Sequence, residues 1–308
     1  MEVFLQQLIN GLTLGAIYGL IAIGYTMVYG IIGMINFAHG DIYMIGAFNA
    51  LIGFLILFGL GVSWVPLTIV VVLLLTVAIT AAYGWTVERV AYRPLRNSTR
   101  LAPLISAIGM SIILQNVAMI AWGRNYLTFP PILPKVDLEF AGANFTLIQV
   151  IIVVVSALTM GALLFLIYRT KLGMAMRATA QNPAVANLMG VNSNRVISAA
   201  FVIGSALGAL AGVMVGTYYE IAHYQMGFML GLKAFTAAVL GGIGNLVGAM
   251  LGGILLGIIE ALGAGYIGDL TGGFLGSHYQ DIFAFVVLIV VLMFKPSGLF
   301  GEKTGDRA

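Results

Sequence analysis

The chain has 308 residues, of which 61% are hydrophobic and only 8% are charged, and its formal net charge is +3. A charged share so far below the usual value of about 25% excludes an ordinary soluble domain, and the cations are too dispersed for a nucleic-acid-binding surface. Because the chain has no cysteine, it can form neither a disulfide nor a thiolate metal site. The composition therefore predicts an all-α protein with many membrane-spanning helices, and membrane lipid as its surroundings.

Apolar stretches of about 20 residues, the length of one membrane crossing, recur along the chain. We expect spans at 8–29, 42–60, 65–85, 102–122, 146–168, 196–219, 246–262 and 279–294. A glycine-containing break at 30–40 follows the first span. The stretch 226–240 is short and contains Lys233, so the sequence leaves eight or nine crossings open. Together they predict one transmembrane domain over 1–308.

Glycines recur at helical spacing in several spans. In the sixth predicted span they fall every four residues, at Gly204, Gly208, Gly212 and Gly216. The first predicted span carries a similar series at Gly11, Gly15 and Gly19. The predicted span 246–262, together with the residues just before it, carries another at Gly244, Gly248 and Gly252. Small residues let helices approach closely in a membrane, so helix packing is favoured over a substrate-lining role.

Unopposed cations predict the orientation in the membrane. Arg89, Arg93, Arg96 and Arg100 follow the third span and are opposed only by Glu88. The loop 169–195 carries four cations and no acidic residue. Because Lys and Arg accumulate in cytoplasmic loops, both loops are expected in the cytoplasm. Counting back from these loops places the N-terminus outside. Counting forward places the C-terminus, EKTGDRA, inside, which corresponds to nine crossings and requires the Lys233 segment to cross.

The loop 169–195 contains the pattern of a short, self-contained helix. Asn182 suits the N-cap, Pro183 the first helical position, and Gly190 the left-handed residue that ends the helix. Such a helix in a cytoplasmic loop suits the docking of a soluble partner. A simple connector between two spans is an equally good interpretation.

Polar residues and glycine breaks at membrane depth are the candidates for a translocation path. The candidate residues are Asn36, His39, Gly40, Asp41, Gln115, Asn116, Gly241, Gly242, Gly244 and Asn245. An interfacial position near a span end is favoured for His39, Asp41, Glu220, His223 and Glu260. Hydrogen bonding between helices is the favoured role of Gln115 and Asn116.

Motifs for catalysis are absent. The chain has no G-x-x-x-x-G-K-[ST], no H-E-x-x-H and no G-x-S-x-G. We therefore expect no catalytic residue, no metal site and no bound cofactor, and uphill transport would take its energy from another polypeptide. The main alternative is an ion-coupled secondary amino acid transporter. Such carriers often have carboxylates at mid-bilayer, and the central halves of the predicted spans contain none.

Four segments resemble the branched-chain amino acid ABC importer permeases: INFAHGDIYMIGAF (35–48), RATAQNPAVANLMGVN (177–192), AVLGGIGNLVGAMLGG (238–253) and FKPSGLFG (294–301). The resemblance covers essentially the whole chain and implies a permease of the bacterial inner membrane. It also implies a second homologous permease, two cytoplasmic ATPases that bind ATP and magnesium, and a periplasmic amino-acid-binding protein.

The resemblance further implies that 178–190 contains the coupling helix that docks on an ATPase. The residues assigned to this coupling loop are Arg177, Asn182, Pro183, Val185, Leu188, Met189 and Gly190. Many ABC permeases carry Glu-Ala-Ala in this place, and the present loop has no Glu.

Overall fold

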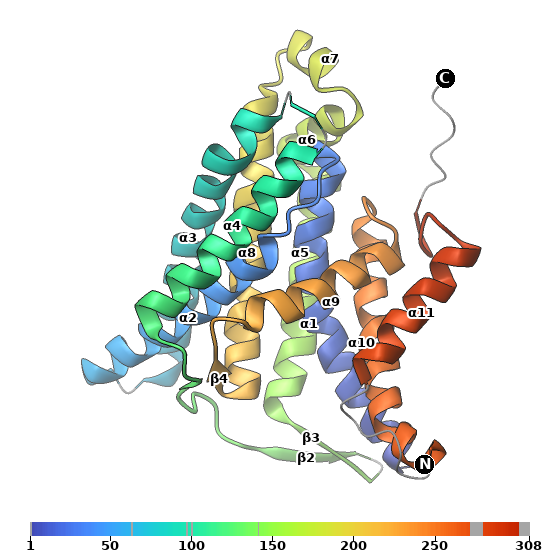
Figure 1. Cartoon of the computed structure of the whole chain (residues 1–308). Helices are drawn as coiled ribbons and strands as arrows, with labels where there is room; N and C mark the ends of the chain where they lie inside the picture. The colour runs from blue at the N-terminus through green and yellow to red at the C-terminus, as the bar shows by residue number, and fades with distance from the viewer. Residues whose placement is uncertain are drawn as a thin grey trace. The chain divides into compact units, whose positions relative to one another are not determined.

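The structure is a computed structural model that describes residues 2–62, 64–96, 98–99, 101–140, 142–271 and 280–301. Its helices are α1 (Glu2–Ile32), α2 (His39–Gly59), α3 (Val65–Val87), α4 (Leu101–Trp122), α5 (Leu147–Arg169), α6 (Lys171–Gln181), α7 (Pro183–Leu188), α8 (Ser193–Tyr219), α9 (Met226–Gly241), α10 (Leu246–Leu270) and α11 (Gln280–Phe294) (Figure 1). A π-helix, η1 (Glu88–Tyr92), and a 3-10 helix, η2 (Arg93–Leu95), continue α3. Four short strands are β1 (Leu127–Thr128), β2 (Asp137–Phe140), β3 (Ala143–Thr146) and β4 (Ile221–Ala222).

The predicted all-α membrane fold is confirmed. Within the described residues, seven helices are long and apolar enough to cross a membrane. The 16 residues of α9 and the 15 of α11 are apolar but shorter than a full crossing of about 20 residues. These two helices account for the difference between seven long spans and the eight or nine that were expected.

Several predicted boundaries were wrong. The first helix runs on to Ile32, so the break after it covers only 33–38, and α10 continues to Leu270. Apolar windows underestimate helices because backbone hydrogen bonding continues where side chains become polar. Some predictions concern residues outside the described ones. These residues are Arg100, the C-terminal tail 302–308 and residue 279, the first of the last predicted span.

The chain forms two compact units. Unit 1 contains residues 1–26, 135–160 and 233–308, and unit 2 contains residues 27–134 and 161–232. The helices α1, α5 and α9 therefore contribute one part to each unit. The expectation of a single domain over 1–308 stays a prediction.

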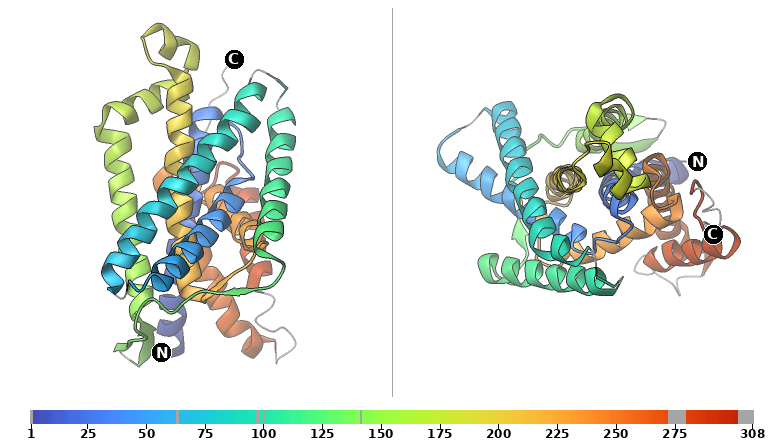
Figure 2. Two further views of the ribbon diagram at one scale, coloured as in Figure 1. Left: turned by 90° about the vertical axis from the view of Figure 1, so that its left-hand side faces the viewer. Right: turned by 90° about the horizontal axis from the view of Figure 1, so that it is seen from above.

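Unit 2 is built on α2, α3 and α8, which pack against one another, with α4 against α2 and η1. Its core contains Tyr92 and Phe201, whose ring centroids lie 5.2 Å apart, beside Val87, Ala107 and Ile197. The antiparallel pair β1–β4 aligns Leu127 with Ala222. The helices α6 and α7 lie at the opposite end of this unit from β1 and β4 (Figures 1 and 2).

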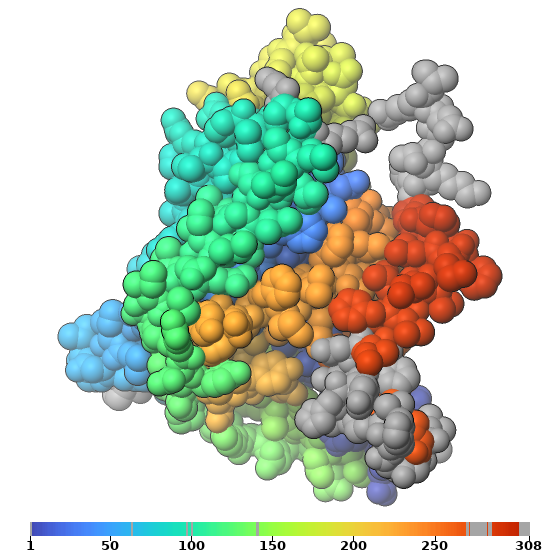
Figure 3. All heavy atoms as spheres, in the orientation of Figure 1, coloured from blue at the N-terminus to red at the C-terminus, as the bar shows by residue number. Residues whose placement is uncertain are grey.

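Apolar side chains also cover the outside of unit 2. The space-filling view shows α4 at the surface (Figure 3, green). Ile105 and Ile120 of α4 and Leu74 of α3 are more than half exposed in the isolated chain. Exposed apolar side chains on spanning helices suit contact with lipid or with another membrane subunit.

In unit 1, α1 and α10 meet along two facing series of glycines. A Cβ added at Gly15 would lie 2.5 Å from the Cα of Ile254, and one at Gly253 would lie 2.3 Å from the nitrogen of Gly19. In the third close contact, a Cβ added at Gly257 would lie 2.3 Å from the backbone nitrogen of Gly15. The glycine series predicted on the first span therefore packs against α10, where its partners are Gly253 and Gly257. Gly252, from another of the predicted series, packs on α9.

Candidate functional site

The short helix α7 forms as the sequence predicts. The side-chain oxygen of Asn182 accepts hydrogen bonds from the backbone nitrogens of Ala184 at 3.0 Å and Val185 at 3.1 Å. Pro183 is the first helical residue, and Gly190 has a left-handed φ of 85°. A helix of this length is marginal alone, so these end interactions are what define it.

Two further hydrogen bonds tie α7 to the start of α8. The backbone nitrogen of Ser193 donates to the side-chain oxygen of Asn187 at 3.1 Å, and the Ser193 hydroxyl donates to the carbonyl of Pro183 at 3.2 Å. Ala186 is the buried residue of α7. These hydrogen bonds attach α7 directly to the N-terminus of α8.

The opposite face of α7 is apolar and open. Val185 is 53% exposed, Leu188 86% and Met189 80%. Such exposure of neighbouring large apolar side chains, on a helix that is otherwise fully capped, indicates a surface for a partner.

Arg177, which the resemblance assigns to the coupling loop, lies at the corner between α5 and α6. Its guanidinium donates to the backbone carbonyl of Ile167 and lies 5.5 Å from the ring centroid of Tyr168. These contacts fix α6 to the C-terminal end of α5, where a cation is favourable. Gly173 is required at the same corner, because an added Cβ would lie 2.1 Å from the Ile167 carbonyl oxygen.

A buried carboxylate connects the ends of α3 and α8. Glu88 is fully buried, pairs with Arg96 and accepts a hydrogen bond from the Ser198 hydroxyl at 2.8 Å. Arg96 also donates to the side chain of Asn194 at 2.7 Å. Burial lowers the pKa of the Arg96 guanidinium, and the Glu88 charge opposes that shift.

Sequence reasoning treated Glu88 only as a counter-charge, although one acid among four arginines was the available signal. A cavity of about 940 Å³ lies at this end of unit 2 and is lined by Arg96, Asn187 and Asn194 among others. Because these residues belong to the network and to α7, the network forms one wall of a cavity beside α7.

The candidate path residues of unit 2 gather where α2 begins. Asn36 accepts a hydrogen bond from the Tyr92 hydroxyl at 2.7 Å. An added Cβ at Gly40 would lie 2.4 Å from the Gly227 carbonyl oxygen, so α2 and the first turn of α9 touch through their backbones. His39 and Asp41 are each 1% exposed, and the interfacial interpretation was therefore wrong for them.

Ser111 and Gln115 of α4 lie near the Asp41 carboxylate, whose Oδ1 is buried without a hydrogen-bond partner among the described residues. The Gln115 side chain donates to the Ser111 hydroxyl at 3.2 Å. This hydrogen bond stays within α4, so the interhelical role of Gln115 stays a prediction. Asn116 does not join two helices: its side chain is exposed and donates to the Ile112 carbonyl of its own helix at 2.8 Å.

The other half of the predicted path belongs to unit 1. Asn245 caps α10 by accepting from the Gly248 nitrogen at 3.0 Å, and it donates to the Phe300 carbonyl at 3.0 Å. Gly242 and Gly244 have positive φ values of 105° and 100°, and an added Cβ at Gly241 would lie 1.9 Å from the Gly248 carbonyl oxygen. These residues form a tight turn that holds the segment after α11. Both polar atoms of the Asn245 amide are used in this structural role.

The glycine stripe of α8 faces α2 and Phe129, which follows β1. An added Cβ at Gly212 would lie 2.6 Å from backbone atoms of Ala47 and Tyr43, and one at Gly216 would lie 2.6 Å from the Phe129 ring. Gly204 is buried in the same helix. At Gly208 the nearest atom would be 3.6 Å away, which is ordinary contact. There is therefore no room for a side chain at Gly212, whereas a Cβ fits at Gly208, one turn earlier.

A buried ion pair lies in unit 1. Lys233 contacts Glu260 at 2.6 Å, and the Tyr18 hydroxyl donates to the other carboxylate oxygen at 3.0 Å. Glu260 is 1% exposed, so the interfacial interpretation was wrong for this residue too. Glu220 and His223 are partly exposed.

Long apolar helices, backbone contacts at glycine and an exposed capped helix define the class of protein as a multi-pass membrane permease. The chain belongs to the family described as branched-chain amino acid transport system / permease component, which residues 7–292 match. The resemblance seen in the sequence is confirmed.

Named relatives cover the chain almost completely. The high-affinity branched-chain amino acid transport system permease protein BraD of Pseudomonas aeruginosa is 49% identical over 99% of this chain and 98% of its own length. The corresponding LivH of Escherichia coli is 47% identical over 99% of this chain and 97% of its own. A more distant relative is the probable branched-chain amino acid transport permease protein LivM of Methanocaldococcus jannaschii, 27% identical over 95% of this chain and 85% of its own.

Proposed function

We propose that this chain is a transmembrane subunit of an ATP-binding cassette importer that carries leucine, isoleucine and valine across the bacterial inner membrane. Its partners are a second homologous permease, two cytoplasmic ATPases and a periplasmic amino-acid-binding protein. ATP and magnesium bind to the ATPases, and this chain contributes no catalytic residue, metal or cofactor of its own. The observation that carries the proposal is α7, whose exposed Leu188 and Met189 supply an apolar docking face, together with the family to which the chain belongs.

In this function α7 and the Glu88 network face the cytoplasm, the N-terminus faces the periplasm, and the C-terminus faces the cytoplasm. ATP-driven movement of the ATPases displaces α7, and its bonds to Ser193 pass that displacement to α8. The Ser198 and Asn194 contacts then carry the displacement to Glu88 and Arg96 at the end of α3. Rocking of α8 against α2 at the glycine stripe changes access to the path.

The test is reconstitution of the complete transporter with Leu188→Asp. A charge in the docking face must be desolvated on binding, so we expect an assembled permease pair that no longer retains or stimulates its ATPases. Leu188→Met keeps an apolar side chain of similar size and is expected to import leucine at the wild-type rate. Normal transport by Leu188→Asp, with the ATPases bound, would reduce α7 to a connector.

One observation favours the ion-coupled alternative. Asp41 is a buried carboxylate on a spanning helix, a position at which proton- or sodium-coupled carriers often place one. Collapse of the proton and sodium gradients, with ATP still supplied, separates the two functions. Uptake that persists supports the ATP-driven importer, and uptake that stops supports the carrier.

A further inference from the structure

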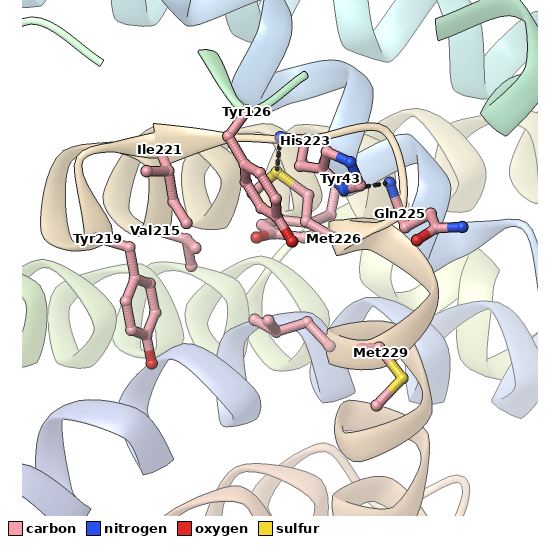
Figure 4. A pocket seen from close by; sticks show the side chains of 10 residues that line it. Tyr43, Tyr126, Val215, Tyr219, Ile221, His223, Gln225, Met226 and Met229 are labelled. Atoms are coloured by element: carbon pink, nitrogen blue, oxygen red, sulfur yellow. Dashed lines mark hydrogen bonds between the residues drawn. The ribbon is translucent and has the colours of Figure 1, made fainter. Parts of the chain in front are cut away.

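Unit 2 contains a cavity of about 320 Å³ near β4. Its walls come from separate elements: Tyr43 of α2, Tyr126 before β1, Val215 and Tyr219 of α8, and Met226 and Met229 of α9. In Figure 4, Val215 and Tyr219 approach from α8 and Met226 and Met229 from α9, while Tyr126 stands beside His223. The volume lies within the range of small-molecule sites, about 300–1,000 Å³.

The Tyr43 hydroxyl is the polar group in this wall that still needs a partner. Tyr43 is 0% exposed, and its hydroxyl has no hydrogen-bond partner among the described residues. A buried hydroxyl without a partner destabilises the fold. Its position beside a cavity therefore indicates a ligand group that completes its hydrogen bonding.

His223, the other polar ring beside the cavity, is already fully bonded. Its Nε2 lies 3.1 Å from the Arg124 carbonyl oxygen, which can only accept, so Nε2 carries the proton. Its Nδ1 accepts from the Gln225 backbone nitrogen at 3.3 Å. The imidazole also stacks on Tyr126, with ring centroids 4.2 Å apart. His223 therefore holds the wall in place, and Tyr43 supplies the buried donor that lacks a partner among the described residues.

The remaining wall suits an aliphatic group of variable shape. Met226 and Met229 are unbranched and flexible, so their thioether chains adapt to differently branched side chains. Val215 and Tyr219 supply a firmer apolar surface opposite. A buried donor without a partner in the described part of the chain, beside an adaptable and mostly apolar wall, matches an amino acid that has a polar end and an aliphatic side chain.

We propose that this cavity is a substrate site on the translocation path, where the carboxylate of leucine, isoleucine or valine accepts a hydrogen bond from Tyr43 and the side chain packs on Met226 and Met229. The site rests on the proposed function and adds to it the place where substrate is held within the chain.

The first test is Tyr43→Phe in the complete transporter, measured as ATP-driven uptake of radiolabelled leucine. The substitution removes only a hydroxyl that makes no internal bond, so assembly should be unaffected. A lost hydrogen bond to a carboxylate weakens binding by about tenfold, and we expect the leucine concentration for half-maximal uptake to rise accordingly. Tyr83→Phe, the same change on the outside of α3 where Tyr83 is 38% exposed, is expected to leave uptake unchanged.

The second test fills the cavity with Met229→Trp. Met229 is 51% exposed, so the larger ring fits without disturbing the core and is expected to abolish most uptake while the complex still assembles. Phe228→Trp, at the adjacent and 56% exposed position, is the matched control and should transport normally.

Wild-type uptake separates the two proposals. If the wild-type complex imports leucine with ATP, and both Tyr43→Phe and Met229→Trp match it, the cavity is not a substrate site and the importer function stands. If the wild-type complex does not import leucine, the proposed function itself fails. Reduced uptake by Met229→Trp but not by Phe228→Trp supports the site even where Tyr43→Phe fails to assemble.

Discussion

At the scale of single residues, the space beside each glycine of α8 differs. Gly212 has backbone atoms of α2 within 2.6 Å of an added Cβ, whereas Gly208 has its nearest neighbour at 3.6 Å. Sequence spacing alone gives both glycines the same packing role. The structure assigns the closest approach of α8 to α2 to Gly212.

We therefore expect Gly212→Ala to destabilise the protein by about 1–3 kcal/mol, because backbone atoms cannot move aside as a flexible side chain can. Gly208→Ala should be neutral or slightly stabilising, since alanine is the better helix former. Thermal unfolding of the detergent-solubilised permease pair measures both. Equal midpoints for the two variants would show that α8 and α2 separate without cost.

The Lys233–Glu260 pair gives a second residue-scale prediction. Glu260→Gln leaves the Lys233 charge buried without its counter-charge, and Lys233→Met leaves the Glu260 charge in the same state. Each substitution should therefore lower the free energy of unfolding by about 3–5 kcal/mol. The double variant Lys233→Met/Glu260→Gln removes both charges and should recover most of the loss. The unfolding midpoints of the wild type and the three variants are measured as a double-mutant cycle. Additive losses in the double variant would mean that the two charges do not stabilise each other.

At the scale of elements, α7 was predictable because its signals are local. A cap, a proline and a glycine at fixed offsets define both ends within 182–190. By contrast, α6 was not predicted, although Thr170 before it is an N-cap residue whose hydroxyl accepts from the Gly173 nitrogen at 3.1 Å. The tight corner between α5 and α6 depends on close backbone contacts at Gly173. The π-helix η1 likewise depends on tertiary contacts, since it holds Glu88 beside Ser198.

The cap of α7 can be tested independently of its docking face. Asn182→Ala removes the acceptor for Ala184 and Val185 and should destabilise α7 by about 0.5–2 kcal/mol. We expect weaker stimulation of ATPase activity in the assembled transporter, while Asn182→Asp keeps an acceptor and should retain most of it. Stimulation by Asn182→Ala equal to wild type would show that the bound ATPase, rather than the cap, holds the helix in shape.

At the scale of the whole molecule, orientation is open to a direct measurement. Because the chain has no native cysteine, single cysteines at Ser98, Val136 and Asn192, all exposed, can be probed with an impermeant thiol reagent. Ser98 replaces Arg96 as the probe for its loop, since Arg96 is engaged with Glu88. We expect Ser98→Cys and Asn192→Cys to react only from the cytoplasmic side and Val136→Cys only from outside. Reaction of Val136→Cys and Asn192→Cys from one side would refute the orientation.

The sequence predicted where most helices lie but not which helices meet. Hydropathy is a property of one segment, so α3, α4 and α5 were located to within two residues at each end. Gly15 meeting Ile254, or Gly40 meeting Gly227, depends on segments far apart in the chain. The cavity at Tyr43 escaped prediction for the same reason, since its walls come from α2, α8 and α9.

The facing glycines of α1 and α10 also set an order of events during biosynthesis. The first helix leaves the ribosome long before its partner at 246–270, and the residues that complete unit 1 come last. Until then, the bare face of α1 at Gly11, Gly15 and Gly19 lies against lipid or against whatever insertion factor shields it. Chains that terminate after α8 lack α10 altogether and would present that uncovered face to membrane quality control.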